Sequence, residues 1–99
     1  MSYTLRPEVV SEAQRIFSPE LTGIVLEKLA ATQLPLDQGG PPPRVHIAVL
    51  WLSQGNLPKL EDALAVAATD WRDSLVAAGL AHANWRSILA SKGIDTTHW

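Results

Sequence analysis

The chain has 99 residues, an apolar fraction of 46% and a net charge of −2. A chain of this length forms one domain around one core, and its interspersed acidic and basic residues argue against non-specific binding to polyanions. Because it contains no cysteine, disulfides, thiolate metal sites and thiol catalysis are excluded. The most apolar stretch, residues 45–52, is far shorter than the roughly 20 residues that span a bilayer, and no targeting segment is visible. We therefore expect a cytoplasmic protein without a membrane span.

Two helices are expected in the N-terminal third of the chain. The first, over residues 7–17, begins with a proline and a glutamate, as first turns often do. The second, over residues 19–31, follows Ser18, a residue type whose hydroxyl caps helices. Residues 5–33 thus read as an N-terminal helical hairpin. The positions expected to face the core are Val9, Val10, Ala13, Ile16 and Phe17, then Leu21, Ile24, Val25 and Leu29.

A connector rich in glycine and proline follows over residues 34–43. Two consecutive glycines are flexible, and the three prolines after them are stiff and extended. A proline run can serve as a ligand for an aromatic groove. We favour the simpler interpretation, a connector between helical parts of one domain.

The third helix, over about residues 43–54, is apolar on almost every side and is therefore expected at the centre of the fold. Gly55 ends it in the left-handed conformation that glycine tolerates. Asn56 is expected to cap a fourth helix that is interrupted at residues 69–70. The inward stripe of this fourth helix is Leu57, Leu60, Ala63, Leu64 and Ala67, widened by Ala65, Val66 and Ala68.

Residues 70–80 and 84–94 repeat one pattern at a constant offset. An aspartate, Asp70, precedes the first copy and an asparagine, Asn84, precedes the second, and both residue types cap helix N-termini. We therefore expect a helix to begin at the start of each copy. The matching pairs are Trp71 and Trp85, Arg72 and Arg86, Leu75 and Leu89, Gly79 and Gly93, and Leu80 and Ile94.

The glycine of each copy predicts a helix end. Gly79 and Gly93 stand where a left-handed residue terminates a helix, usually with an apolar contact between the following residue and the one four before the glycine. The repeat is thereby explained as two short helices, over residues 71–78 and 85–92, that fold as a hairpin. Residues 44–94 as a whole supply the central helix, the fourth helix and this hairpin.

The signals for helix starts and ends do not explain the two arginines of the repeat. Arg72 and Arg86 lie in first turns, where a cation opposes the helix dipole at a cost of about 0.3–1 kcal/mol. We expect each guanidinium to pair with a carboxylate of the chain, and the surface of a partner is the alternative. The candidate carboxylates are Glu61, Asp62 and Asp73.

Four tryptophans are more than the core of a small helical protein needs. Tryptophan and arginine are the residue types that most often dominate contacts between proteins. Trp71 with Arg72 and Trp85 with Arg86 are therefore our candidate partner-binding residues, expected to be partly exposed and close together. The alternative is that both rings cover the core with the arginines stacked outside. The sequence identifies no protein partner and leaves a homo-oligomer open.

No catalytic or metal-binding pattern can be assembled from the sequence. His46, His82 and His98 have no spacing that presents two ligands on one helix face, and His46 reads as a hydrogen-bonded residue at the edge of the core. Phosphate-binding, nucleophile-elbow and zinc-protease motifs are absent from the sequence. We predict no cofactor, no metal and no enzyme activity. An enzyme centred on His46 would need a cleft beside that residue.

DNA binding by residues 71–92 is the alternative function, because two short helices with a glycine at the turn are typical of a helix-turn-helix. The helix that would read the bases has few polar groups, and the chain is acidic overall. Nucleic acid is therefore not the expected partner. The polar groups in question are Asn84, Arg86, Ser87, Ser91 and Lys92.

Residues 44–81 resemble a pattern found in small uncharacterised bacterial helical proteins. The shared positions are Arg44-Val45-His46, Ala48, Leu50, Leu52, Gly55-Asn56-Leu57, Leu60 and Asp70-Trp71-Arg72-Asp73 with Leu75. The resemblance implies a bacterial origin and no particular activity. Together these observations predict an all-α, single-domain bundle of five or six short helices with a C-terminal helical hairpin. They predict a non-enzymatic protein-interaction or regulatory module.

Overall fold

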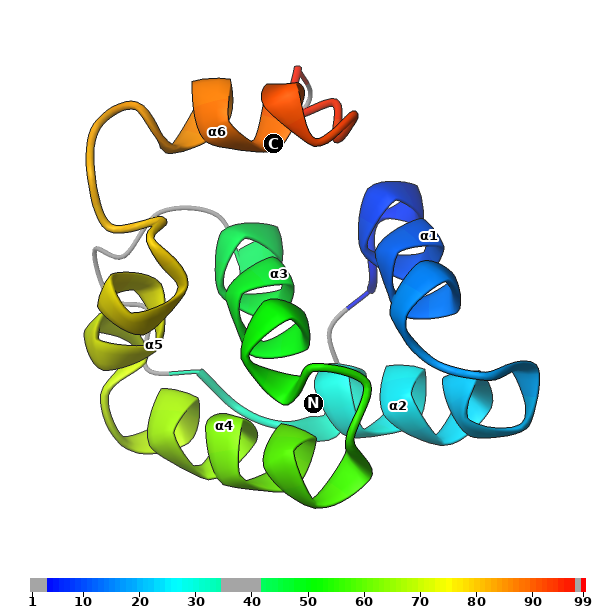
Figure 1. Ribbon diagram of the computed structural model, residues 1–99. Helices are drawn as coiled ribbons and strands as arrows, with labels where there is room; N and C mark the ends of the chain where they lie inside the picture. Colours follow the sequence, from blue (N-terminus) through cyan, green and yellow to red (C-terminus); the bar gives the residue numbers. More distant parts are fainter. Residues whose placement is uncertain (1–3, 35–41, 98) are drawn as a thin grey trace.

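The computed structural model describes residues 4–34, 42–97 and 99. Residues 35–41, which hold most of the predicted connector, lie outside this described part. Six helices and no strand are found within it, so the predicted all-α bundle is confirmed (Figure 1). The helices are α1 (Pro7–Ile16), α2 (Pro19–Ala31), α3 (Pro42–Ser53), α4 (Leu57–Thr69), α5 (Trp71–Ala78) and α6 (Trp85–Ser91).

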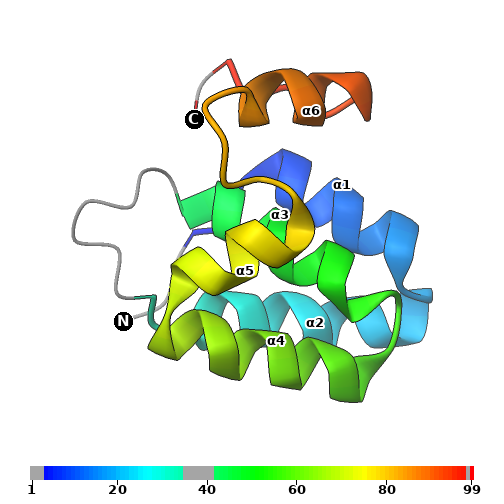
Figure 2. The same ribbon diagram turned by 60° about the vertical axis from the view of Figure 1, so that its left-hand side comes forward.

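Helix α3 is the centre of the bundle, as its composition predicts. Every side chain of residues 45–50 is at most 2% exposed, and a helix that is apolar on all sides must be covered on all sides. The covering comes from α1, α4 and α5, which pack directly on α3 (Figures 1 and 2). The second layer is α2, which lies against α1 and α4.

Helices α1 and α2 pack on each other as the predicted hairpin. Two details of the α2 prediction are wrong. Ile24 is 44% exposed, and Thr22 is buried in its place because its hydroxyl donates to the Ser18 carbonyl at 2.9 Å and needs no water. Ser18 stands at the N-cap but its side chain makes no capping bond. Pro19 follows it and has no N–H, so the first turn has one donor fewer to satisfy.

The start of α4 follows the prediction. The side chain of Asn56 accepts a hydrogen bond from the Lys59 amide at 3.0 Å, and Gly55 before it has the left-handed φ of +76°. Gly55 also lies close to the end of α1, since a Cβ there would stand 3.0 Å from the Ile16 carbonyl oxygen. The predicted widening of the α4 stripe is wrong, because Ala65, Val66 and Ala68 are all exposed.

The repeat is realised as two helix ends with the same backbone geometry. Gly79 and Gly93 both have a φ of +79°. In each copy the residue after the glycine donates its amide to the carbonyl of the predicted contact residue, Leu80 to Leu75 at 2.8 Å and Ile94 to Leu89 at 3.0 Å. At the start, Asp70 accepts from the Arg72 amide at 3.1 Å, whereas the side chain of Asn84 makes no capping bond.

Helix α6 does not pack along α5, so the predicted C-terminal hairpin is an open one. Residues 79–84 carry the chain away from α5, and α6 lies across the end of the bundle near α1 and α3 (Figures 1 and 2). The reason is that α3 and α4 already cover the inner sides of α5. The apolar face of α6 therefore packs on the core at the end of the bundle, where Trp85 and Leu89 are buried.

Candidate partner-binding face

Two of the four tryptophans fasten other elements to α1. The indole Nε1 of Trp51, on α3, donates to Glu12 at 2.6 Å, and the indole Nε1 of Trp99 donates to Glu8 at 2.7 Å. Glu8 and Glu12 are one turn apart on α1, so both carboxylates lie on the same side of that helix. These two rings therefore have a structural role that accounts for their presence.

Glu12 is a buried carboxylate held by several donors. Arg15 donates to both of its oxygens, from Nε at 2.6 Å and from Nη2 at 2.9 Å. These hydrogen bonds lower the pKa of Glu12, burial raises it in opposition, and the bond from Trp51 lowers it further. The net direction is downward, so Glu12 stays ionised at neutral pH and keeps α1 joined to α3.

Trp85 is not the exposed binding residue that the repeat predicts. It is 8% exposed and belongs to the core. The ring of Trp99 stacks on it with the centroids 6.1 Å apart, and the guanidinium carbons of Arg86 and Arg44 lie 4.4 and 4.9 Å from its centroid. The alternative interpretation, a ring that covers the core with arginine stacked outside, is thus the correct one for this copy.

The two arginines of the repeat have different surroundings, and the prediction that both pair with internal carboxylates is wrong. Arg86 donates to the backbone oxygens of Thr96 at 2.7 Å and Trp99 at 3.4 Å. The Arg72 guanidinium lies over the Trp71 ring at 5.3 Å and forms no ion pair within the described part of the chain. Of the three carboxylates predicted as partners, Glu61 instead pairs with Lys28 at 2.8 Å.

Trp71 and Arg72 line a surface hollow of about 330 Å³, and Arg44 of α3 lines it as well. We call it the basic hollow. It joins α5 to the first turn of α3, where Arg44 is held because its Nε and Nη2 donate to the Leu80 carbonyl at 2.9 and 2.6 Å. The lining residues are Arg44, Trp71, Arg72, Leu75, Val76 and Ala81.

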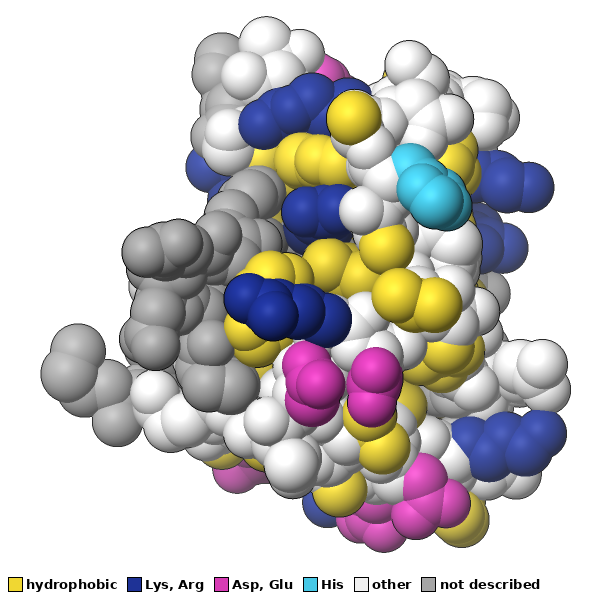
Figure 3. Space-filling view, turned by 90° about the vertical axis from the view of Figure 1, so that its left-hand side faces the viewer, with side chains coloured by type: hydrophobic (Ala, Val, Ile, Leu, Met, Phe, Trp, Pro, Cys, Tyr) yellow, Lys and Arg dark blue, Asp and Glu magenta, His cyan; other side chains and the backbone are white. Residues whose placement is uncertain are grey.

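The basic hollow lies on a face where charged and apolar groups adjoin. Val76 at its edge is 67% exposed, and the two guanidiniums of Arg44 and Arg72 have no carboxylate partner among the described residues. Figure 3 shows this side of the molecule: dark blue basic side chains alternate with yellow hydrophobic ones, and magenta acidic side chains lie beside them. Trp71 reaches this face, and Trp85 contributes mainly by supporting Arg44 from beneath.

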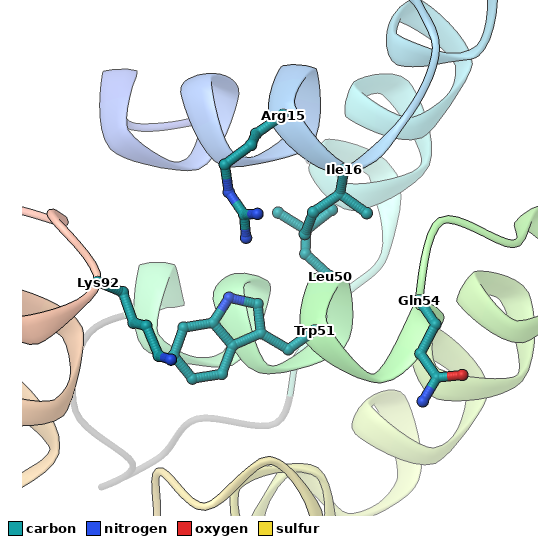
Figure 4. A pocket seen from close by; sticks show the side chains of 6 residues that line it. All are labelled: Arg15, Ile16, Leu50, Trp51, Gln54 and Lys92. Carbon is teal, nitrogen blue, oxygen red and sulfur yellow. The ribbon is translucent and has the colours of Figure 1, made fainter.

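A second and larger hollow, of about 740 Å³, opens between α1, α3 and the end of α6. Figure 4 shows Arg15, Trp51 and Lys92 directed toward this common space. The two cations differ, because Arg15 is neutralised by Glu12 whereas Lys92 forms no ion pair within the described residues. Two of the six residues that line this hollow, Arg15 and Trp51, already donate to Glu12.

His46 offers no support for catalysis. It is 2% exposed, and burial lowers its pKa to about 4, with the Leu29 backbone acting in the opposite direction. A side chain so enclosed presents no surface to a substrate, so the cleft that a His46-centred enzyme needs is not found beside it. Among the described residues, no group of three or more histidine, cysteine or acidic side chains could hold a metal ion. His98 lies outside that part of the chain.

The geometry of the C-terminal helices does not favour the DNA-reading alternative. A helix-turn-helix packs its two helices against each other, whereas α6 lies apart from α5 (Figure 2). Arg86 is bound to backbone oxygens of its own chain, and the Ser91 hydroxyl donates to the Ile88 carbonyl at 2.6 Å. Two of the few polar groups that could reach a base or a phosphate are thus already bonded.

Comparison with protein-family models, with curated proteins and with solved structures finds no match for the chain. The resemblance of residues 44–81 to bacterial helical proteins accordingly stays a prediction. Within the described ranges, no helix combines the length and the apolar character that crossing a membrane requires.

Proposed function

We propose that the chain is a non-enzymatic protein-binding module and that the basic hollow on α5 is its binding site. One observation carries this proposal: two guanidiniums, those of Arg44 and Arg72, lack an ionic partner in the described chain and stand next to exposed apolar surface. The same side of the molecule thus offers charge and hydrophobic contact together, which is the combination found at the centres of protein interfaces.

The chemistry of the hollow favours an acidic segment that also carries a large apolar residue. A carboxylate can accept from the guanidinium groups, and an apolar side chain can lie against Trp71 and Val76. Arg44 is already immobilised by the Leu80 carbonyl and the Trp85 ring. Binding therefore costs little side-chain entropy at that position.

Selection from a phage-displayed random peptide library on the immobilised protein tests the proposal. Enriched peptides should place aspartate or glutamate beside a leucine, phenylalanine or tryptophan, and should bind more weakly as salt rises. Arg72→Ala should weaken their binding by about tenfold, which matches the loss of one charged contact. Lys92→Ala is the matched control, since it removes one exposed cation from the other hollow.

Two results would contradict the proposal. The first is a selection that enriches no acidic–apolar peptide. The second is a set of enriched peptides that bind Arg72→Ala as tightly as the unaltered protein. A cytoplasmic location belongs to the same proposal and is supported by the absence of cysteine from the sequence.

A further inference from the structure

The exposed face of α5 has two flanks of opposite charge. Neighbouring residues on a helix point about 100° apart, so Arg72 and Asp73 lean to opposite sides of this face, and Val76 lies between them one turn further on. On the side of Arg72 is the basic hollow. On the side of Asp73 is a third surface hollow of about 370 Å³, which we call the acidic hollow, between α4 and α5. Its walls include Asp62 and Val66, and the two carboxylates of Asp62 and Asp73 outnumber its one cation, Lys59. The Lys59 ammonium donates to the Gln54 side chain at 3.0 Å.

The charged side chains named on the two flanks lack ion-pair partners among the described residues. Within the residues that the structure describes, neither Asp62 nor Asp73 forms an ion pair, and the same holds for Arg44 and Arg72. Val76, between the flanks, is 67% exposed, and Val66, at the wall of the acidic hollow, is 45% exposed; these are the two highest values among the large hydrophobic side chains of the described residues. A partner for this face must therefore supply acid on one side, base on the other and an apolar ridge between them.

The chain itself carries that pattern in the required order. A twofold axis that runs along α5, between two copies, exchanges the flanks, so the basic hollow of each copy faces the acidic hollow of the other. The same axis brings the two Val76 side chains together at the centre. An axis across α5 would instead set base against base and acid against acid.

We propose that the partner of the basic hollow is a second copy of this chain, joined through α5 in a twofold-symmetric dimer with the two α5 helices parallel. This inference rests on the proposed function, since it names the occupant of the same site. Asp73 and Asp62 of one copy provide the carboxylates for Arg72 and Arg44 of the other. Val76 of each copy fills the apolar centre, and Val66 extends it.

Charge reversal tests the inference, with sedimentation velocity as the measurement. The 10.7 kDa chain should sediment with twice that mass at high concentration. Arg72→Asp and Asp73→Arg should each weaken the dimer by about tenfold or more, because each sets like charges opposite one another. An equimolar mixture of the two variants should restore the association. Val76→Ser should weaken it without altering any charge, and circular dichroism of every variant confirms that the helices remain.

The outcomes separate this inference from the proposed function. Association that survives both reversals, or a mixture of the two variants that stays monomeric, overturns the α5 dimer. A monomeric protein that still selects acidic–apolar peptides also overturns the dimer and leaves the binding function standing. A monomeric protein that selects no such peptide refutes both.

Discussion

The two arginines of the repeat should behave differently when each is replaced by alanine. Their local sequences are nearly the same, Asp70-Trp71-Arg72 and Asn84-Trp85-Arg86. Their tertiary contacts are not the same. Arg86 donates to two backbone oxygens and lies over a buried ring, whereas the Arg72 guanidinium lies over a half-buried ring and binds no other group among the described residues. We expect Arg86→Ala to destabilise the fold and Arg72→Ala to leave its stability almost unchanged.

The magnitudes follow from those contacts. For Arg86, the 2.7 Å bond to the Thr96 carbonyl contributes about 1 kcal/mol at a partly exposed site, and the guanidinium over the ring adds about 0.5–1 kcal/mol. Removing a cation from a first turn returns about 0.5 kcal/mol. The net loss is about 1–1.5 kcal/mol, or about 5–10 °C in Tm for a domain of this size. For Arg72 the ring contact and the dipole term nearly cancel, within about 0.5 kcal/mol.

Urea unfolding followed by circular dichroism measures both free energies without relying on tryptophan fluorescence, which either substitution could alter. Lys92→Ala serves as the control, since it removes a cation just after α6 that forms no ion pair in the described chain. Equal losses for the two arginine variants would refute the reasoning, as would a larger loss for Arg72→Ala. The tertiary contacts of Arg86 would then not be what distinguishes it.

Three further predictions concern pH and glycine. His46 has a folded pKa of about 4, below the ordinary 6.5. The free energy of unfolding should therefore fall by up to about 3 kcal/mol as the pH is lowered from 6.5 to 4. In urea titrations of His46→Leu, the free energy of unfolding should change much less over the same pH range. The pKa of Glu12 is also lowered, so its stabilising contribution is present above pH 4.5 and is lost as the pH falls below that value. Glu12→Gln should destabilise the protein by about 1.5–3 kcal/mol at pH 7. The variant should also lose the part of the decrease in stability below pH 4.5 that Glu12 causes. Gly23→Ala should raise stability by about 0.5–1 kcal/mol, because it lies within α2 and an added Cβ meets nothing within 4 Å. Gly55→Ala should lower it by about 1–2 kcal/mol or more, given its φ of +76° and the Ile16 carbonyl 3.0 Å away, and a thermal melt of the two variants showing the same sign would contradict this contrast.

Local features of the fold were predictable because their causes are local. A cap such as Asn56, a glycine at a helix end and an all-apolar helix each depend on residues within a few positions. The Asn56 cap, the left-handed Gly79 and Gly93 and the buried α3 are found as expected, whereas the side chains of Ser18 and Asn84 make no capping bond. The positions of α5 and α6 relative to each other were not predictable in this way, since they depend on which neighbours already cover α5.

In the candidate site too, local features could be predicted from the sequence, whereas tertiary contacts could not. The repeat identifies Trp71 and Trp85 with equal strength, and only the tertiary structure separates a ring buried beneath Arg44 from one that reaches the surface. One missed residue did carry a signal in the sequence. Glu12 stands at helical spacing on the apolar face of α1, where a carboxylate needs donors from elsewhere in the fold, and the tryptophan indoles are such donors.

The bond between Trp99 and Glu8 joins residues 91 positions apart, and this has a consequence for how the protein folds. Closing so long a loop costs more chain entropy than any contact within the α3–α4–α5 unit, whose members adjoin in sequence. Contacts of this kind form late on a folding pathway. The packing of α6 near α1 should therefore follow the assembly of the central helices. Until then the Glu8 carboxylate should be hydrated where the Trp99 indole later binds it.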